Sequence, residues 1–231
     1  MNAKPIATKP RGRRPSTEDV DVRGQMLDIA TRLFAERGIA ATTVAQIADE
    51  AGVTSAMVHY YFTNRAHLLD AIVEERLVPV IECVWGPTDA RIEHDPFALV
   101  AELVSRFFDV TGRMPWLPPL WLREIANEGG LLRERMIDRI PVEHLKRFAE
   151  GIRLAQQAGA VNPALDPLLL FNSVIALVML PLATSKAWQS ARGLPPLDRV
   201  ALQRHVGALL ECGMRPAAAT PRPAGETRST R

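Results

Sequence analysis

Residues 54 to 60 bring together side chains that can bind DNA, and no acidic residue lies among them. Ser55 can donate or accept a hydrogen bond at the edge of any base, and Met57 can pack on the methyl group of thymine. Thr54, His59 and Tyr60 share the outer side of the same segment. Because the major groove of DNA admits one helix, these groups could read bases if the segment is helical.

The groups around this segment suit the DNA backbone. Thr43 and Arg65 flank it, and together with Tyr60 and His59 they are placed to bind phosphates. Phosphate contacts position a protein on the duplex without reading its sequence. We therefore expect Ser55 and Met57 to contact bases and the other residues to contact phosphates.

Two short helices must position these groups. Thr42 or Thr43 can cap the first helix, a tight turn follows at Gly52, and Thr54 or Ser55 begins the second. Each helix has an apolar side: Val44, Ile47, Ala48 and Ala51 in the first, and Val53, Val58, Tyr61 and Phe62 in the second. This arrangement predicts that Tyr61 packs in the core and that Tyr60 faces outward.

The helix pair resembles the DNA-binding domain of the tetracycline-repressor (TetR/AcrR) family over about residues 20 to 75. The elements that match are Thr42-Thr43, Ile47-Ala48, Ala51-Gly52-Val53, Tyr60-Tyr61-Phe62 and Arg65, followed by Leu68-Leu69. His59 stands where the family usually has Tyr, and Arg65 where it usually has Lys. The resemblance implies an all-α fold of about nine helices, in which a helix-turn-helix domain precedes a larger helical domain that dimerises and holds a ligand pocket.

A basic arm precedes the first helix. Residues 1 to 18 are rich in Pro, Arg and Lys, and Arg11, Arg13 and Arg14 surround a glycine. Such a segment can lie extended in the narrow minor groove of A·T-rich DNA, or it can be a solvated run of charge.

The composition favours a globular protein and shows no sign of an enzyme. Hydrophobic residues make up 47% of the 231 residues, and the net charge is only +2, so basic groups that bind DNA must be localised. The chain has no nucleophile motif, metal signature or phosphate loop, and its five histidines lack ligand spacing, so we expect no cofactor and no metal. The two cysteines, Cys83 and Cys212, are expected to be buried free thiols in the cytoplasm, with a redox-sensing pair as the alternative.

Helical periodicity divides the chain into four parts. After the arm we expect a DNA-binding domain over 19–66, a ligand-binding and dimerisation domain over 67–213, and a disordered tail over 214–231. Within the larger domain the pattern predicts a kink near Pro79, a loop up to Asp95, a helix from Pro96 and a helix broken by prolines at 114–119. It also predicts one amphipathic helix from about 131 to 158, an apolar helix over 167–190 and a final helix over 197–213.

The apolar helix over 167–190 is hydrophobic almost all round, so it must be covered on every side. Its longest apolar run is sixteen residues and contains Asn172, Ser173 and Pro181, which is short for a membrane span of ~20 residues. Pairing with the final helix and with two-fold mates in a homodimer would cover it, and a monomeric core is the alternative. Two-fold symmetry also suits a palindromic operator on double-stranded DNA.

Large adaptable side chains in the larger domain predict a pocket for a small, largely apolar effector. The candidates are Phe107, Phe108, Trp116, Trp121, Phe171 and Met179, with Arg123, Glu124, Asn127 and Asn172 as possible polar anchors. Together with the resemblance, these residues predict a ligand-responsive DNA-binding regulator, and the resemblance implies that it is a repressor. The alternatives are a helical ligand-binding protein and an architectural DNA binder without an inducer.

Overall fold

The computed structural model describes residues 17–190, 193 and 195–216. The described part contains helices and no strand, which confirms the all-α expectation. The predicted basic arm with Arg11, Arg13 and Arg14, and most of the predicted tail, lie outside the described residues.

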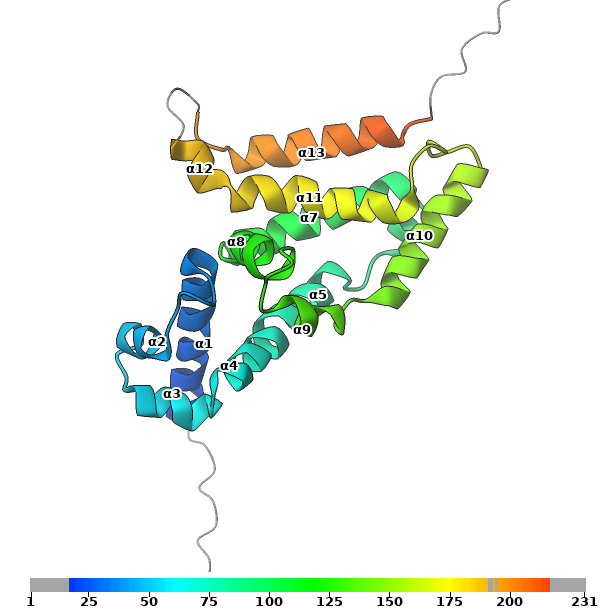
Figure 1. Cartoon of the computed structure of the whole chain (residues 1–231). Coiled ribbons are helices and arrows are strands. Elements are labelled where there is room, and N and C mark those ends of the chain that lie inside the picture. Colours follow the sequence, from blue (N-terminus) through cyan, green and yellow to red (C-terminus); the bar gives the residue numbers. More distant parts are fainter. Residues whose placement is uncertain (1–16, 191–192, 194, 217–231) are drawn as a thin grey trace, which may run out of the picture.

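Three helices at one end of the molecule form a small unit that we call the reader (Figure 1). They are α1 (Thr17–Arg37), α2 (Val44–Glu50) and α3 (Ser55–Phe62). Met26, Leu33 and Phe34 of α1 are fully buried in the core that α1 shares with α2 and its neighbours. Gly38 ends α1 at φ 88° and Gly52 joins α2 to α3 at φ 66°, a backbone region that glycine adopts without steric cost.

A helical segment with one irregular turn leads from the reader into the larger domain. It comprises α4 (Arg65–Ile72), the π-turn η1 (Val73–Leu77) and α5 (Val78–Val84). Within η1 the amide of Val78 donates to the carbonyl of Val73, five residues back. The ring of Pro79 would clash with the carbonyl four residues before it in a regular helix, so the wider turn is placed where the sequence predicts a kink.

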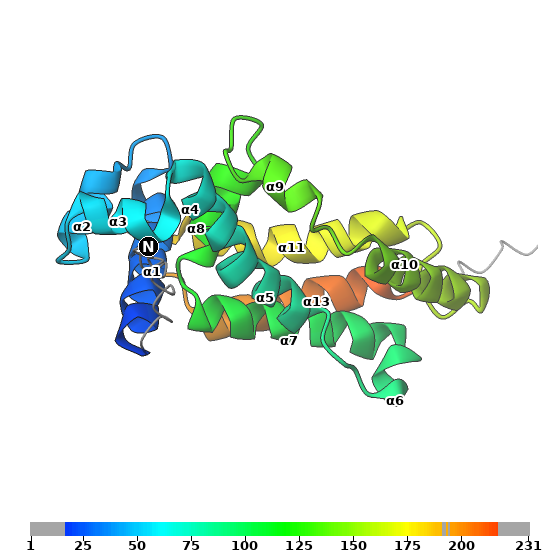
Figure 2. The same ribbon diagram turned by 90° about the horizontal axis from the view of Figure 1, so that it is seen from below.

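The larger domain is built from α6 (Ala90–Glu93), α7 (Pro96–Arg113), α8 (Leu117–Leu120), the π-turn η2 (Trp121–Ile125), α9 (Arg133–Ile137), α10 (Val142–Gln157), α11 (Pro167–Ala183), α12 (Ser185–Ser190) and α13 (Arg199–Met214). Helices α11 and α13 run side by side along the edge farthest from the tip of the reader (Figure 1). Helices α6 and α10 lie at the end of the molecule that is away from the reader (Figure 2). Helix α8 packs on α1 and so joins the larger domain to the reader.

Several predicted helices are broken, so the described part of the chain alone has more helical segments than the nine expected. The single helix predicted over 131–158 is wrong: α9 ends at Ile137 and α10 begins at Val142, because Pro141 cannot continue a helix. The helix predicted over 167–190 is interrupted at Thr184, and the predicted loop before Asp95 contains the short helix α6.

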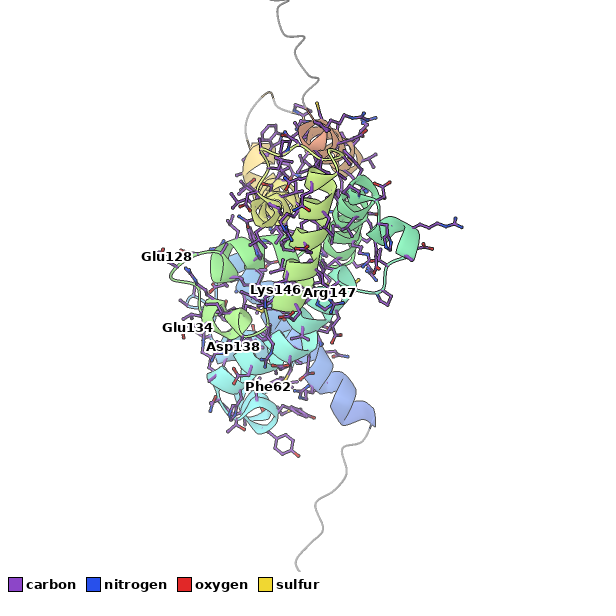
Figure 3. The ribbon with its side chains drawn as sticks, turned by 90° about the vertical axis from the view of Figure 1, so that its right-hand side faces the viewer. Phe62, Glu128, Glu134, Asp138, Lys146 and Arg147 are labelled. Carbon is purple, nitrogen blue, oxygen red and sulfur yellow. The ribbon has the colours of Figure 1, made fainter. Side chains whose placement is uncertain are left out.

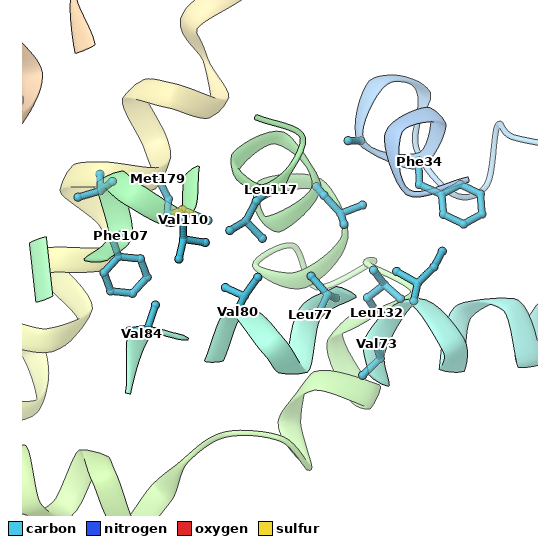
Figure 4. Close-up of a cluster of buried hydrophobic side chains, with 14 of the residues drawn as sticks. Phe34, Val73, Leu77, Val80, Val84, Phe107, Val110, Leu117, Leu132 and Met179 are labelled. Atoms are coloured by element: carbon cyan, nitrogen blue, oxygen red, sulfur yellow. The ribbon is translucent and has the colours of Figure 1, made fainter. Parts of the chain in front are cut away.

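One continuous hydrophobic core connects the reader to the larger domain. It runs from Phe34 in α1, through Val73 and Leu77 in η1, to Phe107 in α7 and Met179 in α11 (Figure 4). Since interiors of this kind are close-packed, a shift in one part is felt in the next.

The cysteine prediction was wrong in one respect. Both thiols are free, but both are exposed and not buried, and Arg113 Nη2 donates to Cys83 Sγ at 3.2 Å. Within the described ranges, none of the helices has an apolar stretch of the length that a bilayer crossing requires. The same ranges contain no cluster of three or more side chains that could hold a metal.

Candidate nucleic-acid interface and effector cleft

The outer side of α3 presents the side chains that the sequence assigned to DNA. Thr54 is the N-cap of α3, and its hydroxyl accepts the amide of Met57 at 3.3 Å. Ser55 is exposed, while 37% of Met57 and 81% of Tyr60 are exposed to solvent. Large apolar and aromatic groups stand in solvent here although Val58 and Phe62 on the other side of the helix are buried. The geometry therefore leaves one face of α3 free to enter a groove.

The prediction for the tyrosine pair is confirmed. Tyr61 is partly buried and packs against the core, and its ring meets that of Tyr60 edge to face at 5.2 Å between centroids. This contact fixes the direction of the exposed Tyr60 ring.

Helix α3 ends in a strained turn. Thr63 has φ 58° and ψ −55°, and the amide of Asn64 donates to the carbonyl of Phe62 at 2.5 Å, which closes a three-residue γ-turn. Nδ1 of His59 lies 3.3 Å from the carbonyl oxygen of Thr63. His59 is exposed, so its other ring nitrogen, Nε2, is accessible for the predicted phosphate contact.

Thr43 caps α2 in a capping box. Its hydroxyl oxygen accepts the amide of Gln46 at 3.2 Å, and its own amide donates to Gln46 Oε1 at 2.8 Å. The hydroxyl hydrogen remains free to donate to a phosphate. The neighbouring Thr42 is buried and donates to the carbonyl of Gly38 at 2.8 Å.

Arg65 has a contact that its sequence assignment did not include. It lies half-buried at the start of α4, and its guanidinium donates to the carbonyl of Thr42 at 2.7 Å and to the carbonyl of Ile39. The guanidinium also lies over the ring of Phe34, 5.8 Å from its centroid. Arg65 therefore holds the α1–α2 turn in place, and a direct phosphate contact from it stays a prediction.

An open cleft with a volume of about 470 Å³ lies beside η2. It brings together two of the predicted anchors, Arg123 and Asn127, with an apolar wall of Pro119, Leu122, Ala126 and Ala183. A volume of this size is typical of sites that bind small molecules.

The predicted aromatic wall does not surround this cleft. Phe107, Phe108 and Met179 are buried in the core, and Trp116 and Trp121 pack partly against it. Phe171 stacks on Trp85 at 5.0 Å between centroids and meets Phe107 at 6.4 Å and Phe148 at 5.8 Å. These rings fill the space between α5, α7, α10 and α11 themselves.

A second cleft of about 230 Å³ lies between α7 and α13 and contains none of the predicted residues. It includes Phe97, Val104 and Leu210.

Glu124, a possible polar anchor in the sequence analysis, does not line the cleft but is buried. Only 6% of it is exposed, and its two carboxylate oxygens accept the amides of Ile39 at 2.8 Å and Leu131 at 3.2 Å. The contact with Ile39 spans 85 residues of chain, so no local spacing could have indicated it.

The chain is similar to known regulators over the reader. The family model described as bacterial regulatory proteins of the tetR family matches residues 26–72. The transcriptional regulator TtgR of Pseudomonas putida is 32% identical over 97 residues, which cover 42% of this chain and 46% of TtgR. The repressor KstR2 of Rhodococcus jostii is 47% identical over 51 residues, 22% of this chain and 25% of KstR2. The chain thus matches less than half of the length of these curated relatives.

Solved structures resemble the whole fold. The ketosteroid regulator KstR2 of Mycobacterium tuberculosis superposes with a TM-score of 0.64 at 20% identity, over 84% of this chain and 94% of that one. SmeT in complex with triclosan superposes with a TM-score of 0.58 at 21% identity, over 89% and 100%. The family model and the curated relatives thus identify residues 26–72 as a DNA-binding domain of the tetR family of bacterial regulatory proteins, and the solved structures show that most of the chain has the fold of such regulators.

Proposed function

We propose that this protein is a ligand-responsive repressor that binds a palindromic operator as a homodimer and is released by a small, largely apolar molecule. The observation that carries the proposal is the outer face of α3, where Met57 and Tyr60 are exposed and no acidic residue intervenes. Such a face is stable in water only because its helix is braced from behind, and it suits a DNA groove. An enzymatic activity is not part of the proposal.

Base readout is assigned to Ser55 and Met57. Phosphate contacts are assigned to Thr43, Thr54, His59 and Tyr60, with a direct or supporting role for Arg65. The arm with Arg11, Arg13 and Arg14 adds sequence-independent affinity, since basic groups near DNA displace counterions.

The exposed sides of α11 and α13 support the dimer. Five large apolar residues on these two neighbouring helices face solvent in the single chain: Leu168, Leu169, Leu180, Val200 and Leu209. Exposed large apolar side chains on two neighbouring helices suit a protein–protein contact, and pairing each helix with its two-fold mate would cover them.

The cleft beside η2 supports an effector site. It is concave and mostly apolar, and it carries two polar groups that could orient a ligand. The relative SmeT was solved in complex with triclosan, which shows that a protein of this fold takes up a small molecule.

The proposal is tested by selecting DNA sequences from a random pool with the purified protein and by measuring gel shifts with the enriched sequences. We expect an enriched inverted repeat, bound by a dimer, from which a compound of a small-molecule library releases the protein. Binding without any sequence enrichment would point to an architectural DNA binder, and no DNA binding at low salt would contradict the proposal. If the protein binds a specific DNA sequence and no compound reverses this binding, the part of the proposal that concerns an effector is wrong.

A further inference from the structure

The π-turn η2 lies between the cleft and the reader. Leu122, Arg123 and Ala126 line the cleft, whereas Glu124 of the same turn is buried on the side of the reader. The turn is a true π-turn, because the amide of Ala126 donates to the carbonyl of Trp121 at 2.8 Å. Single π-turns within helical segments are rare and are found frequently at functional sites.

Glu124 binds the larger domain to the reader through backbone amides. A buried carboxylate is costly unless hydrogen bonds satisfy it, and here the amides of Ile39 and Leu131 do so. The carbonyl of Glu124 also accepts the amide of Leu132 at 3.1 Å. The carboxylate is therefore fixed by its own loop and in turn fixes the position of Ile39.

Ile39 is held from two directions by charged side chains. Its amide donates to Glu124 of the larger domain, and its carbonyl accepts from Arg65, which directly follows the turn at the end of α3. Arg65 also binds the carbonyl of Thr42, next to the cap of α2. A continuous set of charge-assisted hydrogen bonds thus connects η2 to both helices that would contact DNA.

Arg123 connects the cleft to the same turn of the reader. Its side chain runs along Gly38, where an added Cβ would lie 3.2 Å from Arg123 Cδ and 3.8 Å from Nη1. Of the residues that line the cleft in the described chain, Arg123 is the charged one and Asn127 the other polar one. The same added Cβ would lie 3.4 Å from Glu124 Oε1, so the carboxylate of Glu124 is close to the Arg123 side chain, but it is occupied by the amides of Ile39 and Leu131.

We propose that this cleft binds an amphipathic anion, an apolar body that carries a carboxylate, with Arg123 as its counter-ion. Arg123 turns from Gly38 toward the anion, the π-turn follows, and Glu124 loses its hold on the amide of Ile39. Glu124 is thus a positioning residue for DNA binding. The inference rests on the proposed function and deepens it. It assigns a negative charge to the effector, and it names the hydrogen bond between Glu124 and Ile39 as the contact whose loss releases the protein from DNA.

Ligand binding is tested with decanoate and with decanol, which has the same chain length without the charge. Binding is measured by calorimetry and by tryptophan fluorescence, to which Trp121 in η2 contributes. We expect decanoate to bind at least about tenfold more tightly than decanol, and Arg123→Gln to abolish this preference, since an ion pair with a guanidinium contributes more than a neutral hydrogen bond. Arg147→Gln, on the exposed side of α10 (Figure 3), is the matched control and should keep it.

Equal binding of the two compounds by the wild-type protein, or an unchanged preference in Arg123→Gln, would overturn the anionic site. Both results are independent of DNA, so they are distinct from a failure of the proposed function. If the protein binds no operator at all, the charge preference of the cleft still decides whether the ligand class is right.

The route is tested with Glu124→Gln, in which an NH₂ group that cannot accept a backbone N–H replaces one of the two carboxylate oxygens. We expect operator affinity to fall by roughly tenfold, because a hydrogen bond to a charged group is lost at the reader. Glu128→Gln, at an exposed glutamate four residues further on (Figure 3), removes the same charge and should leave affinity unchanged.

A measurement on the wild-type protein covers the case in which Glu124→Gln does not fold. Hydrogen exchange of the Ile39 amide should be slow without ligand and faster by about tenfold or more at saturating decanoate, while exchange in α7 stays constant. Exchange at Ile39 that decanoate leaves unchanged, or a folded Glu124→Gln protein with wild-type operator affinity, would refute the route through Glu124.

Discussion

Thr63 is the one non-glycine residue with positive φ in the described chain, and it lies where α3 ends. A β-branched side chain at φ 58° and ψ −55° is strained, and strain of this kind typically costs ~1–3 kcal/mol. It persists because the cap of α4 at Asn64 and the C-terminus of α3 must meet within a single residue. The turn therefore sets the angle between α3 and α4 at the expense of stability.

We expect Thr63→Gly to raise the free energy of unfolding by ~1 kcal/mol, since glycine adopts this conformation without steric conflict. The same change should weaken operator binding, because α3 is then less rigidly oriented. Denaturant unfolding and gel shifts measure the two effects. Gly52→Ala provides the reverse control: φ is 66° there and no neighbouring atom obstructs a Cβ, so backbone strain alone should destabilise it. A less stable Thr63→Gly protein would show that the turn is not strained.

Met57 and Tyr60 should differ in their effect on DNA specificity. Met57→Ala is expected to change which bases are preferred and to cost ~1–3 kcal/mol on the best site, because a base contact is lost. Tyr60→Phe removes only a hydroxyl that would contact phosphate, so it should lower the affinity for all DNA sequences by a similar factor. Selection from a random pool separates the two, and unchanged base preferences in Met57→Ala would remove that residue from the readout.

At the level of single residues, sequence reasoning succeeded where the chemistry is local. The sequence limits the N-caps of α2 and α3 to Thr42 or Thr43 and to Thr54 or Ser55, and the structure selects Thr43 and Thr54, whose hydroxyls accept from amides three residues ahead. The contacts of Arg65 and Glu124 could not be predicted, because these partners lie 23 and 85 residues away and are backbone groups without a sequence signature.

The helical segment α4–η1 is held by ion pairs on two sides. Toward α1, Arg23 binds Glu75 at 2.6 Å and Arg76 binds Asp28 at 2.7 Å. Toward the loop around α9, Asp70 and Glu74 bind Arg135 and Arg139. Exposed pairs contribute little individually, but this set connects the reader to the segment before α10.

The Arg23–Glu75 pair predicts a dependence of stability on pH. The hydrogen bond from Arg23, reinforced by its charge, lowers the pKa of Glu75 below its ordinary value. A lowered pKa in the folded state means that the stabilisation is complete above the unfolded value of ~4.3 and is lost as the pH falls through the folded value. Melting curves of wild type and Glu75→Gln should therefore differ at neutral pH and converge in acid. Glu128→Gln controls for the loss of one charge, and a difference that persists at the lowest pH would contradict the linkage.

The loop after η2 predicts unequal behaviour of two adjacent glycines. A Cβ at Gly130 would clash with the backbone carbonyl of Glu124, whereas a Cβ at Gly129 meets nothing. Gly130→Ala should therefore lower the melting temperature by several degrees, since a shift of ~4 °C corresponds to about 1 kcal/mol or more in a domain of this size. Gly129→Ala should be close to neutral. Similar melting temperatures for the two variants would show that the loop relaxes freely around Glu124.

The ends of helices could be predicted better from prolines and glycines than from the periodicity of hydrophobic residues. Prolines at positions 79 and 141 marked real irregularities, yet the amphipathic pattern on both sides of Pro141 was continuous enough to suggest one helix. The break at Thr184 has no glycine or proline signal at that residue. The π-turns could not be foreseen either, because a single added residue hardly changes a periodic pattern.

For the whole molecule, the sequence predicted two functional parts, and the structure joins them by one core. Helix α8 packs on α1, and buried side chains continue from Phe34 to Met179 (Figure 4). The aromatic residues expected to line a pocket instead fill this core, while the polar anchors Arg123 and Asn127 reach a cleft at the surface. Residue type alone cannot tell a cavity wall from packed interior, because both need large apolar side chains.

The dimer gives the last prediction. Leu209 on α13 is 47% exposed in the single chain, and Leu154 on α10 is 54% exposed on a helix outside the proposed interface. A glutamate at either position should leave the fold intact, because neither side chain is buried in the monomer. Only Leu209→Glu should place an unpaired charge between two-fold mates, where desolvation without a partner costs several kcal/mol. We therefore expect folded monomers of Leu209→Glu in sedimentation experiments, with loss of binding to an inverted repeat but residual binding at high protein concentration. Leu154→Glu should stay dimeric and bind normally. A dimeric, fully DNA-competent Leu209→Glu protein would exclude α13 from the interface.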